Sequence, residues 1–129
     1  VVNSPRTLEI AIDKWLTLAT VAKEGIDVPR TAVCQTRDQA MTAFETLGGD
    51  VVVKPIFGGE GRGLMRISCS DLAWRVFGTL EVNQSVLYLQ EFVPHANFDL
   101  RILIVGDQWY AMKRTNPNDW RTNIARGGS

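Results

Sequence analysis

Residues 51–63 read VVVKPIFGGEGRG, and this order predicts a strand, a lysine at its end and a glycine-rich loop that leads into a second strand. Three consecutive valines suit an extended backbone and favour a strand that is buried on both faces. Pro55 has no backbone N–H to give to a sheet, so it marks the point where pairing stops. The glycines that follow allow positive φ angles and a close approach to a ligand.

This loop has two interpretations. Its N–H groups could point at phosphate oxygens beside the cation Lys54; equally, the glycines could serve a hairpin turn and Lys54 could be a solvated surface charge. Two familiar phosphate loops are excluded, because the chain has no Gly-Lys dipeptide for a P-loop and Leu64 stands where G-x-G-x-x-G needs its third glycine. A glycine loop between two strands is expected to act as a lid.

The composition limits the classes of protein. A chain of 129 residues is long enough for one ordinary domain. Its 14 basic and 14 acidic residues cancel, so no overall field would recruit nucleic acid or an anionic membrane. No apolar run approaches the roughly 20 residues of a membrane span. Cys34 and Cys69 form neither a disulfide framework nor a metal motif, and we expect a cytoplasmic protein.

The two ends of the chain lack the marks of a complete protein. The chain begins at Val1 without a methionine and stops in a glycine-containing segment, so we expect a fragment of a longer protein. Its last part carries an excess of positive charge that could hold an anion. The basic residues there are Arg101, Lys113, Arg114, Arg121 and Arg126, against Asp107 and Asp119.

The first residues predict a helix that begins at Ser4, its cap, and Pro5, and ends at Gly25. Asp13 could break this helix and cap a second one. Lys14 follows directly and, taken alone, is typical of a solvated helix lysine. Apolar residues at three- and four-residue steps predict the stripe of an amphipathic helix. These are Leu8, Ala11, Ile12, Trp15, Ala19 and Ala22.

The following residues alternate between strand and helix patterns. Strands are expected at 31–34, 51–54, 64–68 and 86–90, with one helix from Thr36 to Gly48 and another from Ser70 through Leu80. This order predicts an α/β lobe of βαββαβ form, whose helical tryptophans and phenylalanines belong to the core. A hairpin is expected after it, with strands at 102–105 and 109–114 around a Gly106-Asp107 turn.

Two short segments could contact a ligand. Pro94 keeps Val93 extended, so backbone groups near Gln90-Glu91-Phe92-Val93 could face a ring such as adenine. Without other evidence, a strand end is the plainer interpretation. Asp99 and Arg101 share one face of the next strand. His95 is expected to be solvated or structural.

Together, the motifs resemble the ATP-grasp superfamily and, within it, the RimK-type ligases that add glutamate to protein or small-molecule carboxylates. The resemblance runs along nearly the whole chain. It rests on Asp13-Lys14, Gly25-Ile26-Asp27-Val28-Pro29, Val53-Lys54-Pro55, the glycine loop 58–63, Gln90-Glu91-Phe92-Val93, Asp99-Leu100-Arg101, Val105-Gly106-Asp107, Asp119-Trp120-Arg121-Thr122-Asn123 and Arg126-Gly127-Gly128.

The resemblance implies a mixed α/β (α+β) fold with three parts. Residues 1–26 would be a leading helix, residues 27–93 the small βαββαβ lobe with its glycine flap, and residues 94–129 the start of the C-terminal ATP-grasp lobe, truncated.

It also implies a role for individual residues. Lys54 would reach the α- and β-phosphates of ATP, and Lys14 would add a second cation from the other lobe. The other implied nucleotide-binding residues are Gly59, Glu60, Gly61, Arg62 and Gly63 over the phosphates, Gln90, Glu91, Phe92 and Val93 at the adenine, and Glu91 or Asp99 at the ribose. Arg101, Arg114, Arg121 and Asn123 would lie beside the γ-phosphate and an acylphosphate.

The implied reaction joins a carboxylate acceptor to an amino-acid amine through an acylphosphate, with ATP and Mg²⁺. The family's metal ligands are expected beyond residue 129, and the fragment is expected not to turn over by itself. One alternative is a regulatory nucleotide-binding module without catalysis. A more remote one is a nucleic-acid binder that uses the basic tail with Trp109, Tyr110 and Trp120.

Overall fold

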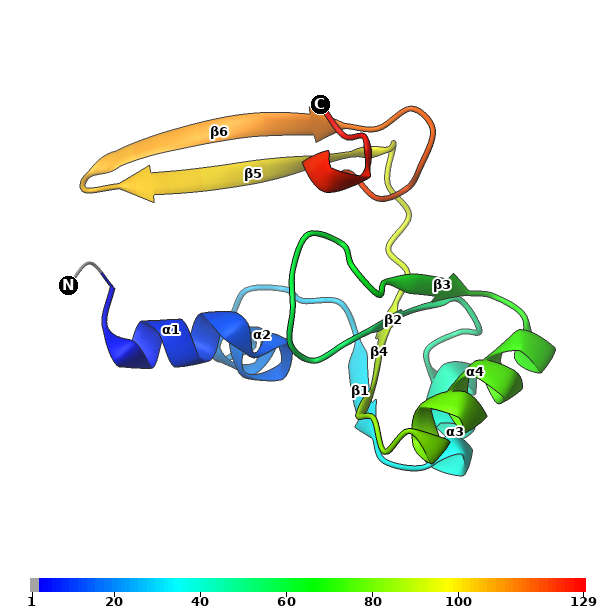
Figure 1. Ribbon diagram of the computed structural model, residues 1–129. Helices are drawn as coiled ribbons and strands as arrows, with labels where there is room; N and C mark the ends of the chain where they lie inside the picture. The colour runs from blue at the N-terminus through cyan, green and yellow to red at the C-terminus, as the bar shows by residue number, and fades with distance from the viewer. Residues whose placement is uncertain (1–2) are drawn as a thin grey trace. The chain divides into compact units, whose positions relative to one another are not determined.

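A computed structural model describes residues 3–129; the side chain of Arg126, counted above among the basic residues, lies outside this description. The chain forms two compact units (Figure 1). Of the described residues, the first contains 3–58 and Gly63–Phe92, and the second contains Gly59–Arg62 and Val93–Ser129.

The first unit begins with two helices, α1 (Pro5–Ile12) and α2 (Lys14–Lys23). The hydroxyl of Ser4 accepts a hydrogen bond from the amide of Thr7 and so caps α1. A carboxylate oxygen of Asp13 caps α2 in the same way, through the amide of Leu16 at 2.9 Å. The break at Asp13 is therefore confirmed, and it places Lys14 at the first position of a helix.

The apolar stripe expected along this segment does not form one buried face. No residue of α1 or α2 is buried, and Ile12 is 63% and Trp15 44% exposed. The stripe extends across Asp13, where the backbone leaves the helical conformation (φ −97°, ψ 113°). Because the helix axis restarts there, positions counted across the break do not share one face.

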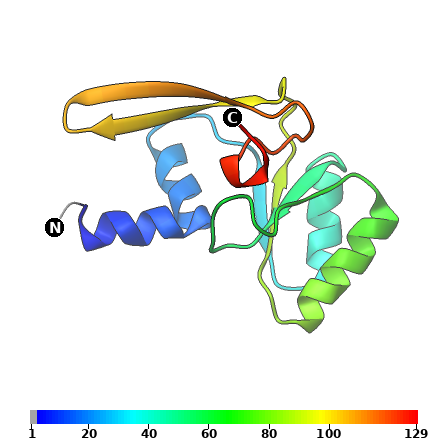
Figure 2. The same ribbon diagram turned by 45° about the horizontal axis from the view of Figure 1, so that its top comes forward.

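The rest of the unit has the expected βαββαβ order. Its strands form one antiparallel sheet in the order β1-β4-β2-β3, and α3 and α4 lie together on one face of it (Figures 1 and 2). Two strands differ slightly from the prediction, since β3 is shorter at both ends and β4 lies one residue later. The elements are β1 (Thr31–Cys34), α3 (Arg37–Thr46), β2 (Val51–Lys54), β3 (Met65–Ile67), α4 (Ser70–Val82) and β4 (Leu87–Glu91).

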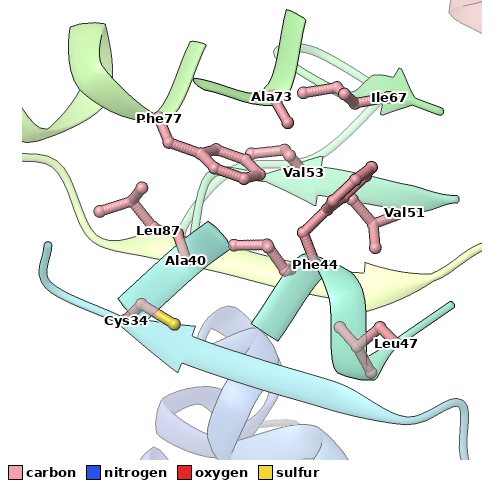
Figure 3. Close-up of a cluster of buried hydrophobic side chains, with 11 residues drawn as sticks. Cys34, Ala40, Phe44, Leu47, Val51, Val53, Ile67, Ala73, Phe77 and Leu87 are labelled. Atoms are coloured by element: carbon pink, nitrogen blue, oxygen red, sulfur yellow. The ribbon is translucent and has the colours of Figure 1, made fainter. Parts of the chain in front are cut away.

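The core lies between the sheet and helices α3 and α4 (Figure 3). Phe44 and Phe77 meet edge to face, with ring centroids 6.3 Å apart, and both are buried. Phenylalanines were thus predicted correctly as core. The core prediction for Trp74 was wrong, because this residue is 44% exposed. The guanidinium carbon of Arg37 lies 3.6 Å from the centroid of its ring. Trp74 follows the buried Ala73 by one residue, about 100° around the helix.

The central strand β2 is buried along its three valines, as predicted. Its side chains alternate between the two faces of the sheet. Val51 and Val53 belong to the core cluster, as do Leu87 and Leu89 of β4. The intervening positions, Lys54 among them, therefore belong to the opposite face.

The second unit contains a long hairpin of β5 (Phe98–Val105) and β6 (Gln108–Thr115) and a short 3-10 helix, η1 (Ile124–Arg126). The turn at Gly106-Asp107 is confirmed, with Gly106 at φ +58°. The pairing begins at Phe98, so β5 starts four residues earlier than expected. No helix among the described residues is long and apolar enough to cross a membrane.

Candidate nucleotide-binding site

A cavity of about 650 Å³ lies within the first unit, on the face of the sheet opposite the core. The sheet contributes Lys54 from β2 and Tyr88 and Gln90 from β4. These positions alternate with the core residues of the same strands, so they point away from the core. The complete lining is Ala11, Ile12, Lys14, Thr17, Leu18, Val21, Val28, Pro29, Lys54, Gly58, Tyr88 and Gln90.

Lys54 is held at the wall of this cavity. Its ammonium donates a hydrogen bond to the side-chain carbonyl of Gln90. Burial lowers the pKa of Lys54, because the charged form loses solvation, and the positive charge of Lys14 lowers it further. Lys54 is therefore not the solvated surface charge of the simpler interpretation.

Lys14 reaches the same cavity from α2. Its ammonium donates to the carbonyl of Gly58 at 2.6 Å, and its backbone amide donates to the carbonyl of Ile56 at 3.3 Å. Its pKa is also lowered, mainly by burial. Both lysines belong to the first unit. Two like charges that repel each other at one cavity favour binding of an anion between or beside them.

The tip of the glycine loop, which belongs to the second unit, is a tight turn. The amide of Arg62 donates to the carbonyl of Gly59 at 3.1 Å, and the two residues between them have positive φ, +58° for Glu60 and +69° for Gly61. This is the pattern of a type I′ turn. The Arg62 amide is thus engaged within the turn, and its guanidinium pairs with Glu60 at 2.7 Å.

Glu91 at the end of β4 and Phe92 after it form hydrogen bonds and ring contacts with other parts of the chain. The carboxylate of Glu91 accepts hydrogen bonds from the backbone amide and the guanidinium of Arg30, at 2.8 and 2.6 Å, and these lower its pKa. The backbone amide of Glu91 donates to Arg30, and that of Phe92 donates to Asp50. The ring of Phe92 lies 3.5 Å from the guanidinium of Arg66. Val93 begins the second unit and is 51% exposed.

The second unit has its own cavity, of about 500 Å³, which brings together Arg101, Arg114 and Asn123 with Glu60 of the loop tip. Arg114 also pairs with Asp99, with 2.7 Å between its Nε and a carboxylate oxygen. Among the described residues the guanidinium of Arg101 has no ion-pair partner, so it is available for an anion.

Asp99, expected at the ribose, and Arg121, expected beside the γ-phosphate, each pair with another side chain. Asp99 accepts from Arg114 and, at 2.6 Å, from the hydroxyl of Thr122, and these hydrogen bonds lower its pKa. Arg121 pairs with Asp119 at 2.6 Å and does not line the cavity. The structure therefore groups three of the four residues expected beside the γ-phosphate and leaves Arg121 apart.

The apolar wall of the first cavity was missed in the sequence. Val21, Val28, Pro29 and Tyr88 line it, although none was a candidate site residue. The alternation along β4 could have identified Tyr88, which shares the face of Gln90. The wall from α2 had no such signal, because an apolar helix residue is equally typical of a core.

No metal site is evident in the part of the chain that the structure describes. None of its His, Cys, Asp and Glu side chains form a group of three or more that could hold a metal ion.

Comparison with known proteins shows which family the chain belongs to. A family model described as "RimK-like ATP-grasp domain" matches residues 11–129. The alpha-aminoadipate–LysW ligase LysX of Saccharolobus solfataricus is 33% identical over 98% of this chain and 48% of its own length. The tetrahydromethanopterin:alpha-L-glutamate ligase of Methanosarcina acetivorans is 28% identical over 100% of this chain and 44% of its own. The chain thus spans about half the length of these curated relatives.

A solved structure shares the fold. The ATP-grasp ligase PsnB, complexed with a minimal precursor, Mg and ADP, superposes with a TM-score of 0.69 at 24% identity, over 92% of this chain and 36% of that one. The expected mixed α/β (α+β) ATP-grasp fold is therefore confirmed. With the family match along almost all of its residues, the chain belongs to the RimK-like ATP-grasp domain family.

Proposed function

We propose that this chain is the ATP-binding part of an ATP-dependent carboxylate–amine ligase. One observation carries the proposal, namely that the ammonium groups of Lys14 and Lys54 line one cavity whose other walls are largely apolar. The family and the relatives named as amino-acid ligases support it.

The residues of the first cavity suit ATP in size and chemistry. A volume of about 650 Å³ lies within the usual range of sites for small molecules. The lysines would hold phosphate oxygens as point charges, and an apolar wall such as that of Val28 and Pro29 would accept a flat base. We propose that the loop 59–63 covers the phosphates, and that residues 90–93 with Asp99 serve the adenine and ribose.

The second unit would contribute to the transfer of phosphate. In the proposed reaction the γ-phosphoryl group passes to a carboxylate, and an amine then displaces phosphate to give an amide. Arg101 and Arg114 would stabilise the charge of the phosphate and acylphosphate, because planar guanidinium groups suit both anions. We include Asn123 and Arg121 in this group. Phosphoryl transfer depends on positioning and charge neutralisation, so it needs no protein nucleophile.

The remaining assignments are also proposals. Mg²⁺ would accompany ATP and neutralise phosphate charge, and we assign no described residue to it. The acceptor would be a carboxylate and the donor an amino acid. A cytoplasmic location agrees with the free thiols of Cys34 and Cys69. We retain the division into residues 1–26, 27–93 and 94–129 as functional parts.

The proposal is tested by calorimetric titration of the chain with ATP. Lys54→Ala should make the binding free energy of ATP less favourable by roughly 1–3 kcal/mol, which corresponds to an affinity about five- to 150-fold lower. This is the size of a lost hydrogen bond to a charged group. Lys23→Ala is a matched control, because Lys23 is exposed at the far end of α2. Equal affinities of Lys54→Ala and Lys23→Ala would remove Lys54 from the site.

Turnover distinguishes a ligase from a nucleotide-binding module without catalysis. The full-length protein, given ATP, Mg²⁺, an amino acid and its carboxylate acceptor, should release ADP in proportion to the amide formed. Binding of ATP without such release would favour the module.

A further inference from the structure

Gln90 is a buried polar residue of β4, the strand between β1 and β2, and only 8% of its surface is exposed. In the sheet it lies directly opposite Thr31 of β1. It is also a diagonal neighbour of Lys54, because Lys54 pairs with Tyr88 and Gln90 with Val52. The register therefore places Thr31, Gln90 and Lys54 on one face, in adjacent strands.

Hydrogen bonds join these three side chains in one direction. The ammonium of Lys54 can only donate, so the atom of Gln90 that faces it must be the carbonyl oxygen. The amide nitrogen of Gln90 then faces the hydroxyl of Thr31, 2.9 Å away, and donates to it. That hydroxyl donates its own proton to the carbonyl of Pro29, also at 2.9 Å. A flipped amide would set two donors against each other at Lys54.

We propose that Gln90, oriented by Thr31, is a positioning residue that holds the ammonium of Lys54 at the cavity wall and leaves its full charge for an anion. The role in ATP binding rests on the proposed function, whereas the effect on Lys54 does not. A neutral acceptor suits this task. Its hydrogen bond replaces part of the hydration that the Lys54 ammonium loses on burial, whereas a carboxylate at the same place would neutralise the charge.

The pKa of Lys54 in the nucleotide-free chain tests the proposal directly, by NMR titration of its ε-carbon and nitrogen. Gln90→Met keeps the length of the side chain and removes the acceptor, so the pKa of Lys54 should fall. Gln90→Glu should raise it. The other titratable residues that line this cavity are Lys14 and Tyr88, and Asp13 acts on both through its charge; these variants keep all three residues.

Substitutions at Thr31 test the orientation without touching Gln90. Thr31→Val removes the hydroxyl that accepts from the amide and should lower the pKa of Lys54 in the same direction as Gln90→Met. Thr31→Ser keeps the hydroxyl and should restore the pKa of the unaltered chain. If Gln90→Met fails to fold, the Thr31 pair carries the test. An unchanged pKa of Lys54 in Thr31→Val and in any folded Gln90→Met would overturn the proposal.

The pH dependence of ATP binding provides a second readout. Gln90→Met should weaken binding about tenfold at pH 7, the size of one charge-assisted hydrogen bond. The deficit should grow between pH 7 and 9, because Lys54 loses its proton earlier in the variant. A deficit that stays constant over this range would indicate a merely structural role and would contradict the proposal. Should the unaltered chain bind no ATP, the proposed function fails while the NMR result still stands.

Discussion

The ammonium of Lys14 donates a hydrogen bond to the carbonyl of Gly58, 2.6 Å away, and so ties the start of α2 to the base of the glycine loop. The backbone amide of Lys14 strengthens this connection through Ile56. A residue that looks like an ordinary helix lysine in the sequence thus has two structural roles. It anchors the loop, and its charge acts on Lys54 within the same cavity.

Removal of the Lys14 charge should change the titration of Lys54. Lys14→Met keeps most of the side-chain volume and removes the like charge, so we predict that the pKa of Lys54 rises. NMR titration of Lys54 measures this, with Lys23→Met as control. A pKa of Lys54 that responds equally to both substitutions would show that Lys14 has no specific effect on it.

Asp99 should make the unfolding free energy depend on pH in the acid range. Its folded-state pKa is lowered, mainly by Arg114, so its contribution to stability is present above the unfolded value near 3.8 and is lost as pH falls through the lower folded value. The side chain is 39% exposed, so we expect about 1 kcal/mol or less. In urea unfolding from pH 2 to 7, the unfolding free energy of the unaltered chain should rise with pH. The slope of this rise should be smaller in Asp99→Asn. Identical slopes would contradict the assignment.

The two large aromatic residues of α4 should differ in their contribution to stability. Phe77 is fully buried against Phe44, so Phe77→Ala should cost about 3–5 kcal/mol of unfolding free energy. Trp74 is 44% exposed, and Trp74→Ala should cost about 1 kcal/mol, through loss of its contact with Arg37. Chemical denaturation measures both. Losses of similar size would place Trp74 in the core, as its sequence suggests.

Gly128 should tolerate no side chain. A Cβ atom built there would lie 2.1 Å from the carbonyl oxygen of Thr122, which is backbone and cannot rotate away. Gly128→Ala should therefore displace the segment and break the pairing of Ser129 with Thr115, whose backbone bonds measure 2.8 and 2.9 Å. Hydrogen exchange at the Thr115 amide should accelerate. Gly59→Ala is the control, since a Cβ there meets nothing within 4 Å; equal exchange in the two variants would refute the steric argument.

Local patterns in the sequence predicted much of the first unit. The valines of β2, the cap at Asp13 and the βαββαβ order each depend on neighbouring residues, which a sequence displays directly. The stripe is divided between two helices, because the predicted cap at Asp13 also restarts the helix axis. The prediction that Trp74 is buried was wrong, because helix periodicity gives the angle between residues around the helix but not the width of its buried face.

The contacts of the site depend on strand register and could not be read from the sequence. The hydrogen bonds of the Gln90 side chain to Lys54 and Thr31 are an example, because they exist only where β4 pairs with both β1 and β2. Likewise, the carboxylates of Glu91 and Asp99, one of which was predicted to bond the ribose, have the arginine partners Arg30 and Arg114, which the sequence analysis did not predict. Such pairings arise between residues far apart in sequence.

The central claim is that Lys14 and Lys54 hold the phosphates of ATP in one cavity. It is tested most directly by following the ε-carbon signals of both lysines by NMR while ATP is added to the chain. We predict that both signals move together and saturate at one ATP concentration, whereas the signal of Lys23 stays in place. If ATP binds and the signals of Lys14 and Lys54 do not move, the cavity is not its site.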